Sequence, residues 1–365
     1  MIFKKTIYII LCISILGLSG CKSKGVSIDK KCEVALVTDI GTVEDGSYNE
    51  AAYNGMLKAC EENNVTAGYF IPKDVTKESY VSEIKKAIKG GAKLIVCPGY
   101  LLEEAVYDMQ KQYKDVSFII LDGEPHNGDY SDVAIGEKTE VIKFADEEAG
   151  FLAGYSAVRD GYRYIGFIGG VPEDSVIKTG YGFVQGADYA AIELGVKIYA
   201  AYSYTDTFSE NDNVKNMAMN WYDNGVEIIY TCGDDMNRSV MSAAEEKGKA
   251  VILSDSSSND SSAAVVFACH HNVEDAIYDA VNSYYKGTFL GGQVKELTVT
   301  EDGLMIDMGN GHFHKFTQAQ YDAIYSVLKS NDIKPYNHTD IATTEELNLV
   351  NTEIIYSDYT SDNVN

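Results

Sequence analysis

Basic residues are scarce in this chain of 365 residues, which has 30 lysines and arginines against 55 aspartates and glutamates. The formal net charge of −25 argues against a nucleic-acid partner, because a phosphate backbone is bound by a basic surface. An anionic ligand would likewise need a local basic pocket. The 45% of apolar residues and 23% of charged residues are otherwise typical of a globular protein with a buried core.

Sequence motifs of catalysis, metal binding and nucleotide binding are also missing. The six histidines form no H-E-x-x-H motif, no serine lies in G-x-S-x-G, and Gly169-Gly170 opens neither G-x-G-x-x-G nor a P-loop. We therefore predict no catalytic residue, no metal site and no cofactor, and we do not expect an enzyme.

Cysteine is sparse, and none of the seven cysteines forms a C-x-x-C pair. Disulfides remain possible in an exported chain, but the pattern favours buried thiols, because several cysteines end apolar runs or lie on a helical period. The cysteines concerned are Cys32, Cys60, Cys97, Cys232 and Cys269.

The apolar run at the N-terminus, Ile7–Leu18, falls short of the roughly 20 residues that a membrane span requires. Lys4 and Lys5 precede it, as in a secretory signal peptide. The sequence Leu18-Ser19-Gly20-Cys21 resembles a bacterial lipobox, which implies cleavage before Cys21 and diacylation of this cysteine. The alternative is an ordinary signal peptide with an incidental cysteine. We expect a lipid anchor on the extracytoplasmic face of the cell membrane.

Short apolar runs alternate with amphipathic stretches over the rest of the chain. Runs that are apolar throughout, separated by helical periods, are typical of parallel sheets whose strands are buried on both faces. The predicted strands are Val34–Val37, Ala67–Ile71, Leu94–Cys97 and Phe118–Leu121, followed by Ile165–Ile168, Val196–Tyr202, Glu227–Tyr230, Val251–Leu253 and Val265–Ala268.

The length and this rhythm predict an α/β protein with two Rossmann-like lobes joined by a hinge. A helix over Phe144–Val158, with Gly150 and Gly154 spaced for close packing, marks the junction. We expect Val294–Thr300 and Leu304–Met308 to pair as closing antiparallel strands. The predicted order is a signal peptide (1–20), a tether (21–32), lobe one (33–140), lobe two with hinge crossovers (141–262), a return to lobe one with the closing strands (263–335) and a loosely ordered acidic tail (336–365).

The loops that follow the predicted strands carry carboxylates, small residues and aromatic rings, with very few cations. Ligands bind at such strand ends, where carboxylates accept hydrogen bonds from sugar hydroxyls and rings stack on planar bases. The set suits a neutral, polyhydroxylated, flat ligand better than a phosphorylated one. The candidates are Asp39, Ser47, Tyr48, Asn49, Asp122, Phe208, Gly233 and Asp255.

Each candidate also has a purely structural interpretation. Ser47 can cap the following helix, with Glu50 completing a capping box. Asp39 and Asp255 can serve as turn or cap residues. The rings of Tyr48 and Phe208 can be part of the lobe packing.

Several segments together are similar to the basic membrane protein family of PnrA-like solute-binding lipoproteins. The family pattern Asp-x-Ser-Phe-Asn-Gln corresponds to Asp45–Glu50, and the similarity continues through Phe118–Gly123, Phe144–Gly154, Ile165–Gly170 and Tyr181–Ala187. It covers roughly residues 33–330. The resemblance implies a type I periplasmic-binding-protein fold that delivers a nucleoside, with purines favoured, to an ABC permease. The resemblance thus implies a binding protein. We expect this protein to be a monomer.

The same resemblance assigns roles to individual positions. Tyr48 and Phe208 would enclose the base, and Asn49 and Asp122 would bind its edge. The ribose would be held by Asp39, Gly233 and Asp255.

The chain departs from the family pattern at three places. His271 stands where the family often has a lysine that binds the sugar, and a neutral imidazole can still donate one hydrogen bond. Thr179 replaces a phenylalanine, and Asp234-Asp235 replace small residues.

Two alternative functions are a ligand sensor that does not take part in transport and a nucleoside hydrolase.

Overall fold

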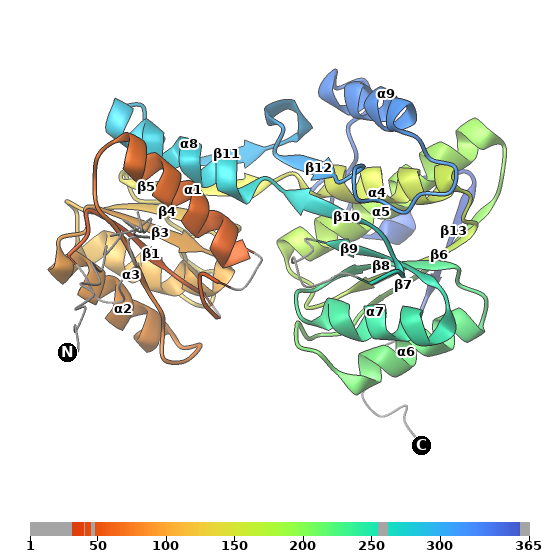
Figure 1. Ribbon diagram of the computed structural model, residues 1–365, viewed down its shortest axis with the longest axis horizontal. Helices are drawn as coiled ribbons and strands as arrows, with labels where there is room; N and C mark the ends of the chain where they lie inside the picture. The colour runs from red at the N-terminus through yellow and green to blue at the C-terminus, as the bar shows by residue number, and fades with distance from the viewer. Residues whose placement is uncertain (1–30, 40, 45–47, 255–261, 358–365) are drawn as a thin grey trace, which may run out of the picture.

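The computed structural model describes residues 31–39, 41–44, 48–254 and 262–357, which form two α/β lobes side by side (Figure 1). Each lobe has one central sheet covered by helices on both faces, as predicted from the apolar runs. Within this described part, none of the helices combines the length and apolarity that a membrane span requires.

The sheet of lobe one has the strand order β11-β5-β4-β3-β1-β2, and all of its neighbouring strands are parallel. Its side chains alternate between two cores, so that Leu36 packs with α1 and Val37 with α2 and α3. The elements of this lobe are β1 (Val34–Val37), α1 (Tyr48–Glu62), β2 (Ala67–Phe70), α2 (Lys77–Gly90), β3 (Leu94–Pro98), η1 (Tyr100–Leu102), α3 (Glu103–Gln112), β4 (Ser117–Leu121), β5 (Thr139–Phe144), α8 (Val273–Lys286) and β11 (Gln293–Leu297).

The sheet of lobe two has the strand order β12-β10-β9-β8-β6-β7-β13. Its strands are parallel except β12, which pairs antiparallel with β10. The elements of this lobe are α4 (Asp146–Asp160), β6 (Tyr164–Gly169), α5 (Asp174–Leu194), β7 (Ile198–Tyr204), α6 (Asp212–Asp223), β8 (Ile228–Cys232), α7 (Met236–Lys247), β9 (Ala250–Ser254), β10 (Val265–His271), η2 (Val299–Glu301), β12 (Leu304–Ile306), α9 (Gln318–Lys329), η3 (Thr344–Glu346) and β13 (Thr352–Tyr356).

Local sequence signals set several helix ends. The Thr76 side chain accepts a hydrogen bond from the backbone of the first turn of α2, and Gly91 ends this helix with a φ of 108°. Thr317 and Gln320 form a reciprocal capping box at the start of α9. These caps satisfy backbone groups that a helix leaves unpaired at its ends.

Helices α4 and α5 pack with their backbones in direct proximity. A Cβ atom added at Gly150 would lie 2.0 Å from the carbonyl oxygen of Thr179, and one at Gly154 would lie 2.0 Å from that of Phe183. The close packing predicted from the spacing of the two glycines is therefore confirmed. It fixes α5, which carries residues of the cleft, against the helix that begins at the junction of the lobes.

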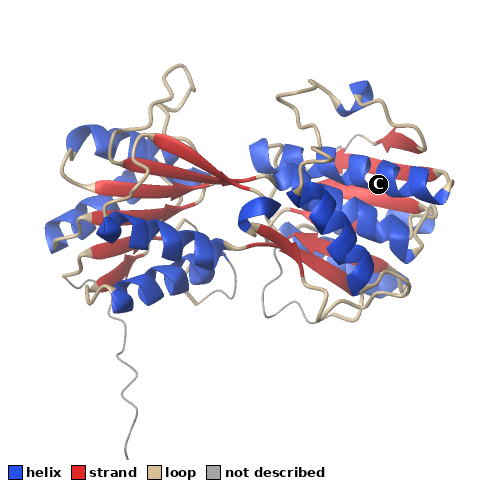
Figure 2. Cartoon of the chain, turned by 90° about the horizontal axis from the view of Figure 1, so that it is seen from above, coloured by secondary structure: helices blue, strands red, loops and turns tan. Residues whose placement is uncertain are grey.

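The chain crosses between the lobes at three places, and these connections lie together in the narrow region between the sheets (Figure 2). The first crossover runs from β5 into α4, the second from β10 into α8, and the third from β11 into η2. The cleft between the lobes is therefore bordered by the ends of β5, β10 and β11.

Two predictions for the hinge region are wrong. Residues 294–300 and 304–308 do not pair with each other, because β11 extends the parallel sheet of lobe one and β12 pairs antiparallel with β10 in lobe two. Residues 263–335 accordingly divide between the lobes, with only α8 and β11 returning to lobe one. The predicted helix at residue 144 is also shifted, since β5 continues to Phe144 and α4 begins at Asp146.

The expectation of a loosely ordered tail is also wrong for the residues described. Strand β13 pairs in parallel with β7 at the edge of the sheet. The carboxylate of Asp188 accepts hydrogen bonds from the backbone of Val350 at 3.1 Å and of Asn351 at 2.7 Å, and Glu147 accepts one from Asn337 at 2.8 Å. This segment is held by hydrogen bonds to buried carboxylates and by a few apolar side chains, among them Leu347, which is buried in the core. Residues 358–365 lie outside the described part.

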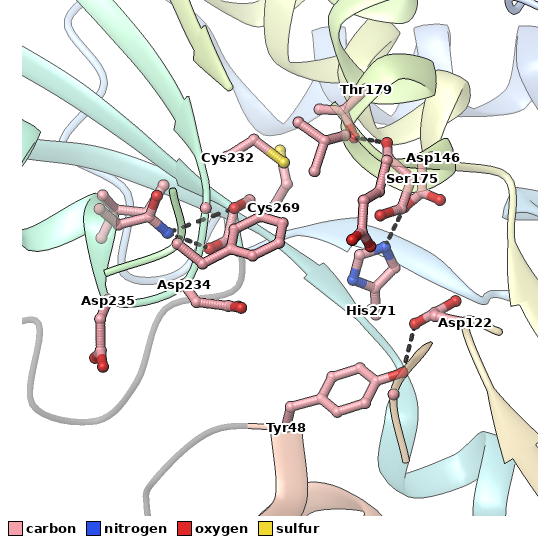
Figure 3. A pocket seen from close by; sticks show the side chains of 18 of the residues that line it. Tyr48, Asp122, Asp146, Ser175, Thr179, Cys232, Asp234, Asp235, Cys269 and His271 are labelled. Carbon is pink, nitrogen blue, oxygen red and sulfur yellow. Dashed lines mark hydrogen bonds and ion pairs between the residues drawn. The ribbon is translucent and has the colours of Figure 1, made fainter. Parts of the chain in front are cut away.

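The five cysteines in the described part are all buried free thiols, which confirms that interpretation. The thiols of two of them, at the ends of β8 and β10, border the cleft between the lobes (Figure 3).

Candidate functional site

A cavity of about 430 Å³ lies between the lobes at the carboxyl ends of the strands. It receives all but two of the predicted ligand-binding residues, drawn from both lobes. Those that line it are Asp39, Tyr48, Asn49, Asp122, Phe208, Gly233 and His271. Ser47 and Asp255, together with the predicted lipidation site Cys21, lie outside the described residues.

Tyr48 and Asp122 form a connected pair on the wall of lobe one. Tyr48 is the first residue of α1, and its hydroxyl donates a hydrogen bond to the Asp122 carboxylate (Figure 3). Asp122 directly follows β4 and has a φ of 48°, a left-handed conformation that aspartate adopts more readily than most residues. An aromatic face and a carboxylate thus meet at one point of the cavity.

Asn49 and Asp39 form a second pair on the same wall. The amide nitrogen of Asn49 donates to the Asp39 carboxylate over 2.8 Å, and Asn49 is only 4% exposed. The hydroxyl of Tyr80 donates to the backbone oxygen of Asp39 at 3.0 Å and so holds the turn after β1 in place. The Asn49 amide oxygen in turn accepts from the backbone nitrogen of Asp39 at 3.4 Å, so the two residues hold each other in fixed positions at the cavity wall.

Phe208 is the aromatic residue that lobe two contributes. Its ring lies over Gly170, where an added Cβ atom would come within 2.6 Å of the ring. Across the cleft, the centroid of the Tyr100 ring lies 6.3 Å away at an interplanar angle of 56°. Tyr100 belongs to a predicted strand-end loop, but the sequence did not single it out as a ring of the cleft.

His271 meets Asp146 at the hinge. His271 ends β10, Asp146 begins α4, and the imidazole Nε2 lies 2.7 Å from a carboxylate oxygen (Figure 3). The ring of Phe144 packs against the imidazole with centroids 4.6 Å apart. Burial raises the pKa of the Asp146 carboxyl, while the hydrogen bond and the charge of His271 oppose this shift. The pair therefore joins two of the three crossovers on the wall of the cavity.

Glu173 borders the cavity from lobe two, at the residue before α5. Burial raises the pKa of its carboxyl to about 7, and the nearby charges of Glu103 and Asp234 contribute to the rise. A side-chain hydrogen bond with Tyr100 of lobe one acts in the opposite direction. Glu173 and Asp146 are functional candidates that the sequence did not reveal, although Asp146 lies within a segment that resembles the family.

The floor of the cavity contains small and apolar groups. Thr179 and the thiols of Cys232 and Cys269 line it (Figure 3). The Thr179 hydroxyl donates to the Ser175 carbonyl oxygen of the same helix at 2.9 Å. The floor of the cavity therefore carries a threonine side chain at the position where the family pattern has a phenylalanine.

The charge of the cavity wall is strongly negative. Carboxylates of both lobes line it, and among the described lining residues Arg238 alone belongs to the lysines and arginines. Arg238 lies 3.3 Å from Asp235 and is thereby neutralised. Such a wall favours a neutral or cationic ligand over a phosphorylated one. In the described part of the chain, no group of three or more histidine, cysteine, aspartate or glutamate side chains could hold a metal ion.

The sequence profile of Bmp, described as ABC transporter substrate-binding protein PnrA-like, matches residues 32–345. The chain belongs to the Bmp family. Basic membrane protein B of Borrelia garinii subsp. bavariensis is 29% identical over 318 residues, covering 84% of this chain and 89% of the relative. The ABC transporter nucleoside-binding protein BmpA of Lactococcus lactis subsp. cremoris is 28% identical over 240 residues, covering 64% of this chain and 65% of that protein.

Solved structures confirm the predicted fold of this Bmp protein. A solute-binding protein of an ABC transporter system from Aeropyrum pernix K1 superposes with a TM-score of 0.69 at 18% identity, covering 86% of this chain and 95% of that one. The corresponding protein of Conexibacter woesei gives 0.66 at 18% identity, covering 83% and 98%. The family is described as PnrA-like substrate-binding proteins of ABC transporters, and this chain is a member of it.

Proposed function

We propose that this Bmp protein is the lipid-anchored, extracytoplasmic nucleoside-binding component of an ABC importer, with purine nucleosides favoured. The observation that carries the proposal is the cavity between the lobes, which has an aromatic residue from each lobe and carboxylates at the strand ends. A nucleoside combines a flat base with a neutral sugar rich in hydroxyl groups, and this cavity offers a partner for each part.

The base would lie between Tyr48 and Phe208, which approach from opposite lobes. Stacking of a base on an aromatic side chain contributes about 1–3 kcal/mol in single-strand recognition. Asn49 and Asp122 would bind the edge of the base. Purines are favoured because their larger ring system gives more stacking area between two rings.

The ribose would be bound by acceptors that follow the strands. Asp39 and Gly233 line the cavity, and Asp255 is the third proposed member. Each carboxylate oxygen accepts hydrogen bonds from sugar hydroxyls but repels a phosphate. His271, held by Asp146, would take the place of the lysine that the family often uses at the sugar.

Closure of the lobes would link binding to delivery. Each lobe supplies part of the contacts, so the ligand favours the closed arrangement by its higher affinity for it. The permease would then recognise the closed form. The proposed anchor is a diacylated Cys21, with residues 21–32 as a tether that lets the body reach the permease.

Thermal unfolding of the purified full-length protein tests the proposal. A bound ligand at about 100 times its Kd stabilises a protein by about 2.7 kcal/mol, which gives a clear rise in Tm. We expect guanosine, inosine or adenosine to raise the Tm, and guanosine monophosphate to do so less, because the wall is acidic. The absence of any shift with purine and pyrimidine nucleosides would refute the nucleoside assignment. Release of free base during incubation would indicate a hydrolase instead.

A further inference from the structure

The hydroxyl of Tyr48 has a partner that stacking alone does not require. It donates a hydrogen bond to the Asp122 carboxylate, which lies at the edge of the ring (Figure 3). A base stacked on the ring face would have its own edge next to the same carboxylate.

The backbone of Asp122 is held on both sides. Its amide donates to the carbonyl oxygen of Ile142 at 2.9 Å, and its φ is 48°. The following residue is Gly123, where an added Cβ atom would lie 3.0 Å from the Cα atom of Tyr100. Because the backbone has so little freedom, the direction of the carboxylate depends on the side-chain torsions, and the Tyr48 hydroxyl restrains these.

We propose that Tyr48 is a positioning residue that directs the Asp122 carboxylate toward the base edge and thereby selects bases that donate a ring N–H there. The proposal rests on the proposed nucleoside function and adds the determinant of base selectivity. An ionised carboxylate accepts hydrogen bonds and cannot donate them. It therefore favours a base with an N–H at this edge, such as hypoxanthine or guanine, over one without.

Inosine and purine riboside are matched probes for this idea. Both have a purine ring to stack and the same ribose, but only inosine carries the N1–H donor. We expect the full-length protein to bind inosine more tightly than purine riboside. In Tyr48→Phe the ring remains and the hydroxyl is lost, so the affinity for inosine should fall by about two- to twelvefold, the value of one hydrogen bond. The affinity for purine riboside should change by less than about twofold, since stacking is retained.

Two control variants separate positioning from stacking. Tyr48→Leu should weaken both probes alike, and Asp122→Asn should abolish the preference for inosine. Isothermal titration calorimetry gives the affinities of the unmodified protein and the three variants for both probes. Equal losses for both probes in Tyr48→Phe would overturn the proposal, because the hydroxyl would then act on packing alone. Equal affinity of the two probes for the unmodified protein would also overturn it.

A ligand-free measurement keeps this proposal distinct from the function on which it rests. If the unmodified protein binds neither probe, the nucleoside function itself fails. Crystal structures without ligand then test the positioning role directly. A carboxylate of Asp122 that keeps its direction in Tyr48→Phe would refute it, and a carboxylate that turns away supports it.

Discussion

Glu148 links the stability of the hinge to pH. This residue of α4 is 8% exposed, and its carboxylate accepts a hydrogen bond from the backbone nitrogen of Val299 at 2.8 Å, at the third crossover. Burial, together with the charges of neighbouring glutamates, raises the pKa of its carboxyl from 4.5 to about 7, although the hydrogen bond from Val299 opposes the rise. Between about pH 4.5 and pH 7, the folded protein therefore binds more protons at Glu148 than the unfolded chain does. The free energy of unfolding therefore falls as the pH rises through this interval.

The size of the effect follows from the shift. A difference of one pKa unit corresponds to about 1.4 kcal/mol, so ionisation of Glu148 removes about 3 kcal/mol by pH 8. Glu148→Gln keeps an oxygen that can accept from Val299 but does not ionise. We expect this variant to lose about 2–3 kcal/mol less than the unmodified protein between pH 5 and pH 8.

Urea titrations at both pH values measure these free energies. The other titratable groups are common to the two proteins, so the difference between their two losses reports the ionisation of Glu148 together with its interactions with the neighbouring glutamates. Glu61→Gln, at an exposed position of α1, is the matched control and should reproduce the loss of the unmodified protein. If Glu148→Gln shows the same loss as the control, the burial argument is refuted.

Three further predictions concern the cleft and the packing of lobe two. Phe208→Ala should weaken nucleoside binding by about 1–3 kcal/mol, as calorimetry would show; an unchanged Kd would leave the ring with only its packing over Gly170. The affinity of the unmodified protein for a nucleoside should fall between pH 6 and pH 8. Over this range Glu173, whose pKa is about 7, ionises at the cavity and repels the nearby carboxylates of Glu103 and Asp234. Glu173→Gln should bind equally at both pH values, and a fall of the same size in this variant would contradict the assignment. Gly154→Ala should lower the free energy of unfolding by about 1–3 kcal/mol or more, because the new methyl group would meet the carbonyl oxygen of Phe183; urea midpoints that match the unmodified protein would exclude the clash.

The central strands of both sheets were predictable because they are buried on both faces. β1, β3 and β4 are buried along their whole length and, apart from Ser117 at the start of β4, have no polar side chain, so each is visible as an apolar run. The outer strands carry a weaker signal. β11 reads Gln-Val-Lys-Glu-Leu and β13 reads Thr-Glu-Ile-Ile-Tyr, since one side of an outer strand borders solvent. Their sheet and direction depend on partners far away in the sequence.

The candidate site could be predicted as far as strand ends determine it. Asp39, Asn49 and Asp122 follow predicted strands or their loops, and the structure places them on one wall of the cavity. Tyr100 lies in such a strand-end loop, but its contacts with Phe208 and Glu173 could not be found this way, because they are contacts between the two lobes. No periodicity in the sequence records which side chains face each other across a hinge.

The late return of α8 and β11 to lobe one has a consequence for folding during synthesis. Helix α8 packs so closely on α1 that a Cβ atom at Gly55 would lie 2.1 Å from the carbonyl oxygen of Glu274. Lobe one therefore remains incomplete until more than 200 residues beyond α1 have been translated. Until then, the face of α1 that packs on α8 is uncovered. Contacts between such distant segments form slowly. The proposed export of the chain would therefore begin before lobe one could complete its fold.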